Sequence, residues 1–316
     1  MTTPARAVRF AAPGGPQVLS LENVELADPG PGEVRVRQRA VGVNYMDVYH
    51  RSGLYPLPMP SGVGVEASGT VEQVGAGVAE FKAGDRVCYD TGAPGAYADL
   101  RIVPADRLIG IPDGVSDEIA AAILLKGMTA EYLLNRCYRL KSREFALFYA
   151  AAGGVGLLAG QWARHIGACM IGVASGAEKC RLAFDAGYIA VIDRSREDVL
   201  ARVKDITGGA GVPVVYDSIG KATFDASIKC LAPRGLFVSF GTTTGAPPPV
   251  EAALLQKSGS LYFTRPTMVT YCSARADMLA SAKAVFDLYL KGILKPHIGQ
   301  TYPLAEAARA HADLEA

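Results

Sequence analysis

A glycine-rich loop, Ala151-Ala-Gly-Gly-Val-Gly156, contains the residues whose types and spacing point most clearly to chemistry. It fits the G-x-G-x-x-G pattern, with alanine at the first glycine position. Gly153 would let the backbone approach a pyrophosphate, and Gly156 would let a helix lie close to a strand. The free N–H groups and partial positive charge at the start of such a helix attract phosphate. The loop therefore predicts dinucleotide binding, and the alternative is a glycine-rich packing turn.

The elements on either side of this loop favour the dinucleotide. Phe145–Ala150 is a continuous apolar run suited to a central strand, and Val155–Ile166 repeats apolar residues at helical spacing before Gly167. Further apolar runs follow, each separated by a helix-sized segment: Met170–Val173, Ala190–Ile192, Val214–Tyr216, Leu236–Phe240 and Ser260–Phe263. The last of these, Ser260–Phe263, is expected at the edge of the sheet. This alternation predicts βαβ units and a parallel sheet, hence an α/β fold.

The residues that follow the strand predicted at Met170–Val173 indicate which dinucleotide is bound. An NAD site usually has Asp or Glu there for the ribose 2′-OH, whereas this chain has Ser175, Gly176 and Lys179. Arg194, after the third strand, is a second cation that can pair with phosphate. These residues predict NADP(H).

Two observations leave that prediction open. Lys179 and Arg194 are also of the type found as solvated surface charges, and Glu178 is an acidic residue close to the strand tip. The place of Glu178 after Gly176 indicates that it points away along the next helix.

The first part of the chain differs from this pattern. Short alternating runs at Val34–Val41, Ala67–Val74 and Gly84–Tyr89 lie between glycine and proline turns. They predict a β-dominated domain with the strand spacing of a small barrel. At the other end of the chain, Ser273–Lys291 and Leu304–Ala316 are expected to be helices. Because the second ends without a cap, we expect the natural chain to continue.

Composition limits the function classes. The 316 residues carry 32 Lys and Arg against 31 Asp and Glu, so the net charge of +1 argues against nucleic-acid binding. No apolar run is long enough to span a membrane, and the N-terminus lacks a secretory signal, which predicts a cytoplasmic protein. The six cysteines are widely spaced, which favours reduced thiols over disulfides.

The chain as a whole resembles the medium-chain dehydrogenase/reductase superfamily, and within it the zinc-free quinone oxidoreductases that include ζ-crystallin. The resemblance rests on blocks in the same order along almost the entire chain: Val43–Asp47, Arg51–Pro56, Gly62–Ala67, Ala83–Val87, Leu125–Thr129, Ala151–Gly156, Val215–Ser218, Val238–Gly241 and Thr264–Pro266.

This resemblance implies an architecture and an activity. A GroES-like β-barrel catalytic domain is expected at residues 1–125, a Rossmann NADP(H)-binding domain with a doubly wound parallel sheet at 126–262, and a return to the catalytic domain at 263–316 that lacks its final segment. The implied assembly is a homodimer joined through the edge of the Rossmann sheet. The implied activity is NADPH-dependent reduction of a quinone or a related electrophilic small molecule.

The resemblance also implies the absence of metal. Zinc-dependent relatives have a cysteine at the position of Asn44 and a histidine at the position of Val65. The four cysteines of their structural zinc lobe have no counterpart after Asp90. We therefore expect no metal site.

The cofactor contacts implied by the resemblance lie along the whole chain. They are Asn44, Tyr132, Gly154, Val155, Ser175, Lys179, Ser218, Phe240, Gly241, Thr242, Thr264, Arg265 and Pro266. The other candidate cofactor residues of this chain are Met46, Asp47, Lys126, Thr129, Ala152, Gly153, Gly176 and Arg194. One departs from close relatives, which have tyrosine at the position of Arg194.

Without a metal, catalysis depends on holding the nicotinamide against an acceptor that is already electrophilic. The candidate catalytic residues are Asn44, which would hydrogen-bond the nicotinamide ribose or the acceptor oxygen, and Tyr49 and Tyr55, which would line the acceptor slot and donate a proton. The alternatives are barrel-edge packing for the two tyrosines, a turn or cap role for Asp47 and a core role for Met46.

Two other functions compete with quinone reduction. An alkenal or enone reductase would need the same slot and differ in where the hydride goes. An RNA-binding or structural, crystallin-like protein belongs to a different class, and the near-neutral charge argues against RNA.

Overall fold

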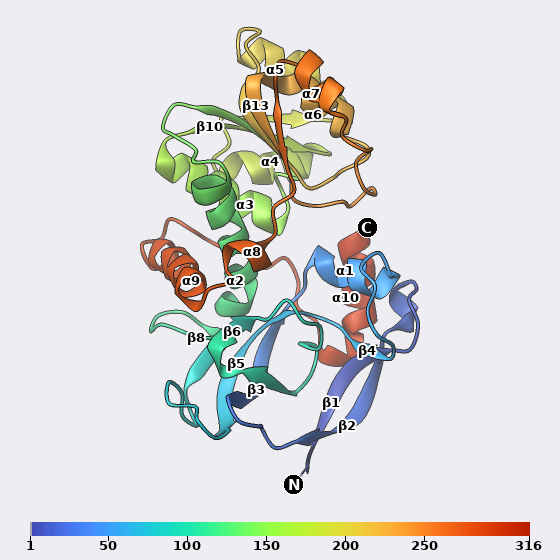
Figure 1. Cartoon of the computed structure of the whole chain (residues 1–316), viewed down its shortest axis with the longest axis vertical. Coiled ribbons are helices and arrows are strands. Elements are labelled where there is room, and N and C mark those ends of the chain that lie inside the picture. The colour runs from blue at the N-terminus through green and yellow to red at the C-terminus, as the bar shows by residue number, and fades with distance from the viewer. Residues whose placement is uncertain (1) are drawn as a thin grey trace. The chain divides into compact units, whose positions relative to one another are not determined.

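The structure, a computed structural model, describes residues 2–316. The chain divides into two compact units (Figure 1). The first unit runs to Leu125 and resumes at Ile298–Ala316, and the second comprises Lys126–His297. Residues 263–297 thus lie in the second unit, whereas the sequence placed the return to the first at 263.

The first unit is built on two antiparallel sheets. The three-stranded sheet has the order β2-β1-β4, with β1 (Thr2–Phe10), β2 (Ser20–Ala27) and β4 (Ser61–Gly62). The five-stranded sheet has the order β7-β3-β5-β6-β8, with β3 (Glu33–Gly42), β5 (Glu66–Val74), β6 (Arg86–Asp90), β7 (Leu100–Pro104) and β8 (Leu108–Gly110). Alternating side chains of β3, β5 and β6 form a buried core that includes Val34, Val71 and Val87.

Short helices complete the first unit. They are η1 (Pro16–Val18), α1 (Tyr45–Ser52), η2 (Ala105–Arg107), η4 (Leu304–Glu306) and α10 (Ala307–Glu315). The helix expected at Leu304–Ala316 therefore begins as a 3-10 turn. Apolar residues of this C-terminal segment pack against Val8, Phe10 and Tyr97, which anchors it to the first unit. The chain passes into the second unit within α2 (Asp117–Glu131).

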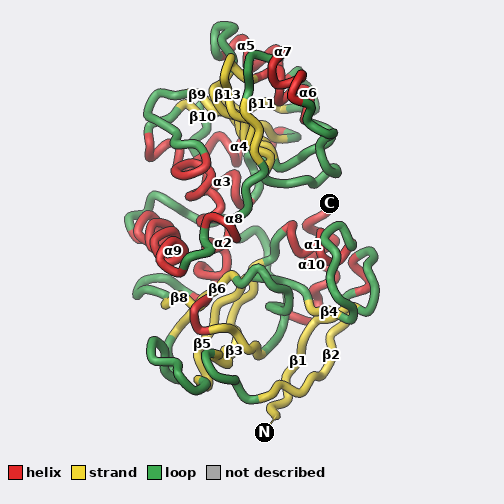
Figure 2. Tube along the Cα trace, viewed as in Figure 1, coloured by secondary structure: helices red, strands yellow, loops and turns green. Residues whose placement is uncertain are grey.

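A six-stranded parallel sheet forms the second unit, and Figure 2 shows its strands in yellow. The order is β11-β10-β9-β12-β13-β14, with β9 (Phe145–Tyr149), β10 (Cys169–Ala174), β11 (Ala190–Asp193), β12 (Val212–Asp217), β13 (Leu231–Ser239) and β14 (Tyr262–Thr264). All six strands expected from the sequence are present. The last begins after Ser260, whose left-handed φ of 57° interrupts extended structure.

Five helices join consecutive strands of this sheet: α3 (Gly154–Ile166), α4 (Ala177–Asp185), α5 (Val199–Ile206), α6 (Phe224–Cys230) and α7 (Ala252–Lys257). The unit also contains η3 (Tyr132–Cys137), a π-helix before β9, and two helices after β14, α8 (Met268–Tyr271) and α9 (Arg275–Leu290). The strand order changes direction at β9, and α3 contacts α4 while α5 contacts α6. Right-handed crossovers therefore place the first pair on one face and the second pair on the other, as in a doubly wound sheet.

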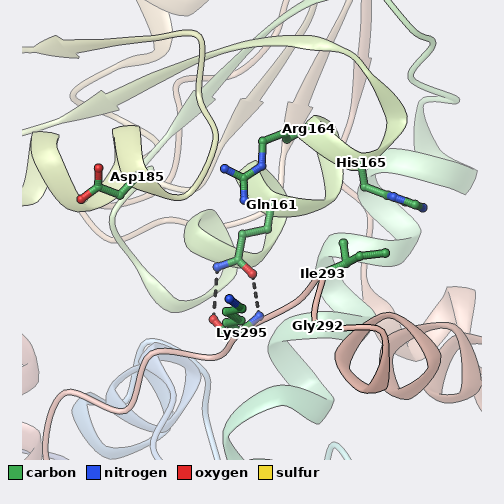
Figure 3. A pocket seen from close by; sticks show the side chains of 7 residues that line it. All are labelled: Gln161, Arg164, His165, Asp185, Gly292, Ile293 and Lys295. Atoms are coloured by element: carbon green, nitrogen blue, oxygen red, sulfur yellow. Dashed lines mark hydrogen bonds between the residues drawn. The ribbon is translucent and has the colours of Figure 1, made fainter.

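A polar clamp fixes the segment that follows α9. The Gln161 amide accepts a hydrogen bond from the Lys295 N–H (2.6 Å) and donates one to its carbonyl (3.1 Å) (Figure 3). A surface pocket beside the clamp is lined by Gln161, Arg164, His165, Asp185, Gly292, Ile293 and Lys295. It lies near the C-terminal end of α3 and contains none of the predicted site residues.

Within residues 2–316, no helix combines the length and apolar character needed to cross a membrane.

Candidate functional site

The carboxyl ends of the parallel strands meet at one edge of the second unit's sheet, and predicted residues lie just beyond them. Gly153 follows β9, Ser175 follows β10 and Arg194 follows β11. Ser218 follows β12 and Phe240 follows β13. The loops after β9 and β12 flank the point at which the strand order reverses, where open α/β sheets bind ligands.

The glycine-rich loop is shaped for phosphate. No side chain caps the N-terminus of α3, and both Gly153 and Gly154 are exposed there. A Cβ on Gly156 would lie 2.4 Å from the Ala150 carbonyl oxygen and 2.6 Å from that of Ala151. Only glycine therefore fits where helix and loop approach so closely, and the first N–H groups of α3 stay available to an anion.

The tips of β10 and β11 form one polar cluster. The Arg194 guanidinium donates from Nε to the Ser175 hydroxyl (2.8 Å), so two predicted phosphate contacts already touch. Gly176 has a φ of +85°, a conformation that favours glycine. Lys179 is exposed one turn into α4.

An acidic residue does lie in this cluster, on β11. Asp193 Oδ1 accepts from the Gly176 N–H (3.0 Å) and from the N–H and hydroxyl of Ser195 (3.0 and 2.6 Å). These hydrogen bonds lower the pKa of the Asp193 carboxyl. That oxygen is therefore occupied by protein donors.

The loops after β12 and β13 pack tightly together. A Cβ on Gly241 would lie 2.6 Å from the Ser218 carbonyl oxygen, and the Phe240 ring packs on Phe148 with centroids 5.5 Å apart. After β14, the Arg265 guanidinium donates to the Ser239 carbonyl (3.1 Å). Predicted residues of all three loops, including Thr242, Thr264 and Pro266, are thus brought to the same edge.

Three predicted residues of the second unit come from α2 and η3. The Lys126 side chain lies beside Gly154, whose Cβ would be 2.8 Å from the lysine Cδ. Thr129 contacts the Met268 sulfur at 3.9 Å. Tyr132 is buried and stacks on Tyr271 with centroids 4.8 Å apart, and burial raises its pKa above the usual range.

In the first unit, two fully buried carboxylates fix Asn44. The Asn44 amide Nδ2 donates to Glu66 Oε2 (2.9 Å), and its main-chain N–H donates to Asp47 Oδ2 (2.9 Å). Asp47 is therefore a cap of α1, the alternative raised for it from the sequence, and its cofactor role stays a prediction. Glu66 Oε1 also accepts from the Leu125 N–H (2.6 Å).

The two candidate tyrosines lie together next to this group. Tyr49 is buried, with its ring 5.1 Å from that of Tyr55 and 5.4 Å from that of Tyr45, edge-on in both cases. Tyr55 is half-buried, as is the candidate cofactor residue Met46. The predicted first-unit residues therefore cluster around α1.

Two buried carboxylates beside predicted site residues were not predicted from the sequence. Glu66 lies in the Gly64-Val65-Glu66 triplet, whose only sequence signal is the missing histidine. Asp217, at the end of β12, accepts hydrogen bonds from two backbone N–H groups and two hydroxyls. In the part of the chain that the structure describes, no three His, Cys, Asp or Glu residues are grouped as metal ligands.

Comparison with known families gives the class. Residues 30–113 match the family described as the alcohol dehydrogenase GroES-like domain, and residues 154–283 match the zinc-binding dehydrogenase family. Together with the dinucleotide-binding edge, these matches define an oxidoreductase of the alcohol-dehydrogenase type.

Individual relatives narrow the class. The chain is 50% identical over 313 residues to a quinone oxidoreductase of Pseudomonas aeruginosa, covering 99% of this chain and 96% of that protein. It is 43% identical over 305 residues to a 2-haloacrylate reductase of a Burkholderia species, covering 94% and 92%. The crystal structure of Escherichia coli quinone oxidoreductase complexed with NADPH matches with a TM-score of 0.97 at 45% identity, covering 98% and 96%. The chain belongs to the zinc-free quinone oxidoreductases of the medium-chain dehydrogenase/reductase superfamily.

Proposed function

We propose that this protein is an NADPH-dependent quinone reductase that uses no metal. The observation that carries the proposal is full-length similarity to quinone oxidoreductases, one of them complexed with NADPH. The Asn44 and Val65 side chains at the positions of zinc ligands in zinc-dependent relatives support the metal-free mechanism.

The second unit fits the cofactor. The backbone at Gly156 leaves no room for a Cβ, the start of α3 has no capping side chain, and Arg194 already holds the Ser175 hydroxyl. A pyrophosphate would meet the free N–H groups of α3, and a 2′-phosphate would meet the Ser175–Arg194 pair together with Lys179.

NADPH, when bound, supplies a hydride to an electrophilic acceptor. The protein's own contribution is orientation and a proton. We propose that Asn44, held by Glu66 and Asp47, orients the nicotinamide ribose or the acceptor oxygen, and that Tyr49 and Tyr55 line the acceptor slot. Tyr55 is the more exposed of the two tyrosines and is the proposed proton donor.

Reduction of an activated alkene is the second candidate activity. The 43% identical 2-haloacrylate reductase favours it, because its name describes an acceptor with a carbon–carbon double bond next to a carboxylate. An RNA-binding or structural role has no such support.

A rate panel tests the proposed function. Purified enzyme with NADPH should reduce quinones faster than alkenals or 2-haloacrylates. With NADP⁺ it should not oxidise simple secondary alcohols, because that oxidation needs a metal or strong base to ionise the hydroxyl. Rates should be unchanged after exhaustive chelation. A rate with alkenals well above the rate with every quinone would show that alkenals, not quinones, are the substrate class. Stoichiometric zinc in the purified enzyme, together with loss of turnover after chelation, would refute the metal-free mechanism.

Lys179→Ala is expected to raise the KM for NADPH about tenfold and to leave the KM for NADH unchanged. Because the side chain is exposed, the free energy of its contact with a 2′-phosphate lies at the low end of the ~1.5–3 kcal/mol typical of hydrogen bonds to charged groups. Steady-state kinetics with both cofactors measures the change. Lys204→Ala, an exposed lysine on α5, is the matched control. Equal effects on both cofactors would contradict the assignment.

A homodimer joined through the sheet edge is the proposed assembly. Among the described strands β14 pairs only with β13, and Tyr262 on it is 63% exposed. Unpaired edges of this kind favour pairing with a second copy. Light scattering at micromolar concentration should give about twice 33.2 kDa.

Two variants test whether the dimer interface lies at the β14 edge. Tyr262→Lys should shift the mass toward 33.2 kDa at low concentration, because a charge on an edge opposes pairing. Phe184→Lys, an exposed aromatic on α4, should leave the mass unchanged. A wild-type mass of one chain would contradict the dimer.

We also propose that the enzyme acts in the cytoplasm. Among the described residues, none of the six cysteines forms a disulfide, as is usual in reducing compartments.

A further inference from the structure

A chain of buried polar groups links α1 to the C-terminal helix of the first unit. The Tyr97 hydroxyl lies 3.1 Å from Asp47 Oδ2 and 3.2 Å from His311 Nε2. His311 Nδ1 lies 3.4 Å from Arg51 Nη1, which donates to Glu315 Oε1 (2.6 Å). Asp47 and His311 are fully buried, and Arg51 and Tyr97 are 2% and 3% exposed.

The chemistry of the donors and acceptors fixes the direction of each hydrogen bond in this network. An arginine can only donate, so His311 Nδ1 must accept from Arg51 and the imidazole proton must lie on Nε2. His311 Nε2–H then donates to the Tyr97 oxygen, and the Tyr97 O–H donates to the Asp47 carboxylate. Burial, aided by the positive charge of Arg51, lowers the pKa of His311 to about 4, which keeps the imidazole neutral as this direction requires.

Arg51, His311, Tyr97 and Asp47 thus form one hydrogen-bonded network that ends at Asn44. Asp47 Oδ2, which receives the Tyr97 O–H, also accepts from the Asn44 N–H (2.9 Å). The C-terminal helix is anchored at both of its own ends, by Ala307 in the apolar core and by Glu315 on Arg51. Arg51 is held in turn by the Gly14 carbonyl, to which its Nε donates (3.1 Å).

We propose that Tyr97 and His311 are positioning residues for Asn44: His311 orients the Tyr97 hydroxyl, Tyr97 orients the Asp47 carboxylate, and Asp47 holds the backbone of Asn44 in place. The inference rests on the proposed function, in which Asn44 takes part in quinone reduction. It assigns to α10 a part in turnover although α10 supplies no predicted cofactor or substrate contact. Because small misplacements of an orienting group slow catalysis steeply, the expected loss of turnover is roughly 10- to 100-fold.

Tyr97→Phe is the direct test, because it removes one oxygen atom and leaves the ring. We expect kcat for quinone reduction to fall at least tenfold, while the NADPH dissociation constant changes less than twofold. In an Asn44→Ala background the same change should have no further effect on kcat, because Tyr97 acts through Asn44. A purely structural role of Tyr97 would lower activity equally in both backgrounds.

His311 is tested by a pair of variants. His311→Leu removes donor and acceptor together and should reproduce the loss seen with Tyr97→Phe. His311→Gln restores one acceptor for Arg51 and one donor for Tyr97, and should recover most of kcat. Tyr302→Phe is the matched control and should keep full activity, because it removes a hydroxyl that donates to Asp313, on the helix that carries His311, and takes no part in this network.

The outcomes separate the two proposals. A wild-type enzyme without quinone reductase activity would refute the proposed function. An active wild type that loses turnover with Asn44→Ala but keeps it with Tyr97→Phe would overturn the positioning role alone. If His311→Leu fails to fold, the double-variant comparison at Tyr97 decides the question by itself.

Discussion

Replacing Gly156 by valine is expected to weaken NADPH binding at least 100-fold. The first carbon of any side chain at this position would lie 2.4 and 2.6 Å from two backbone carbonyl oxygens, neither of which can rotate away. Relief requires the first turn of α3 to move from the loop that precedes it, and such overpacking costs about 1–3 kcal/mol or more. The same movement displaces the N–H groups that would hold the pyrophosphate, so the loss falls mainly on the cofactor.

Isothermal titration of NADPH into wild type and variant measures this loss. Gly110→Val is the matched control, because no atom lies within 4 Å of a Cβ at that strand position and the residue is exposed. NADPH affinity in Gly156→Val within tenfold of wild type would show that the pyrophosphate is held elsewhere.

The second unit was the part of the fold most accessible from the sequence. Its buried strands are continuous apolar runs, and Gly153 and Gly156 identify the loop between the first strand and its helix. The boundary at 263 was harder to place, because β14 is three residues long and α9 carries no signal for the unit it joins. In the first unit, β4 has two residues and was not expected, since its pairing with β1 depends on residues about 50 positions away.

Candidate site residues were accessible where they follow a strand. Ser175 and Arg194 were predicted separately, each from its place beyond a strand tip, and their contact follows from the parallel pairing of β10 with β11. The same logic did not reveal that Asp193 is the acidic residue of this cluster, because its hydrogen bonds to Gly176 and Ser195 depend on side-chain geometry.

Buried polar networks were the part that sequence could not supply. Tyr97 and His311 are 214 positions apart, and Asn44 and Glu66 are 22 apart on different elements. Neither pair has a periodic or spacing signal, since their hydrogen bonds arise from tertiary packing. His311 was one of four scattered histidines, and only the fold shows it to be fully buried.

Asp217→Ala is expected to lower the free energy of unfolding of the second unit by about 3–5 kcal/mol. The carboxylate is fully buried, with Oδ1 accepting from the Ile219 and Gly220 N–H groups (2.7 and 3.1 Å) and Oδ2 accepting from the Thr223 and Ser227 hydroxyls (both 2.7 Å). Alanine leaves these donors without an acceptor, and each buried unsatisfied group costs about 1–3 kcal/mol. The hydroxyls can rotate toward other acceptors, so the two backbone N–H groups carry most of the loss.

The single tryptophan makes this loss measurable in one unit. Trp162 is buried in α3, so its fluorescence follows unfolding of the second unit alone. At roughly 2–4 °C per kcal/mol, the fluorescence Tm should fall by about 10 °C, while Asp225→Ala, an exposed carboxylate on α6, should leave it within 2 °C. The Tm of Asp217→Asn should lie between the Tm values of these two variants. An amide accepts hydrogen bonds only at its oxygen and presents its NH₂ to the donors on the other side. Equal Tm values for Asp217→Ala and Asp225→Ala would mean that the loop from Ser218 to Gly220 is held by contacts other than this carboxylate.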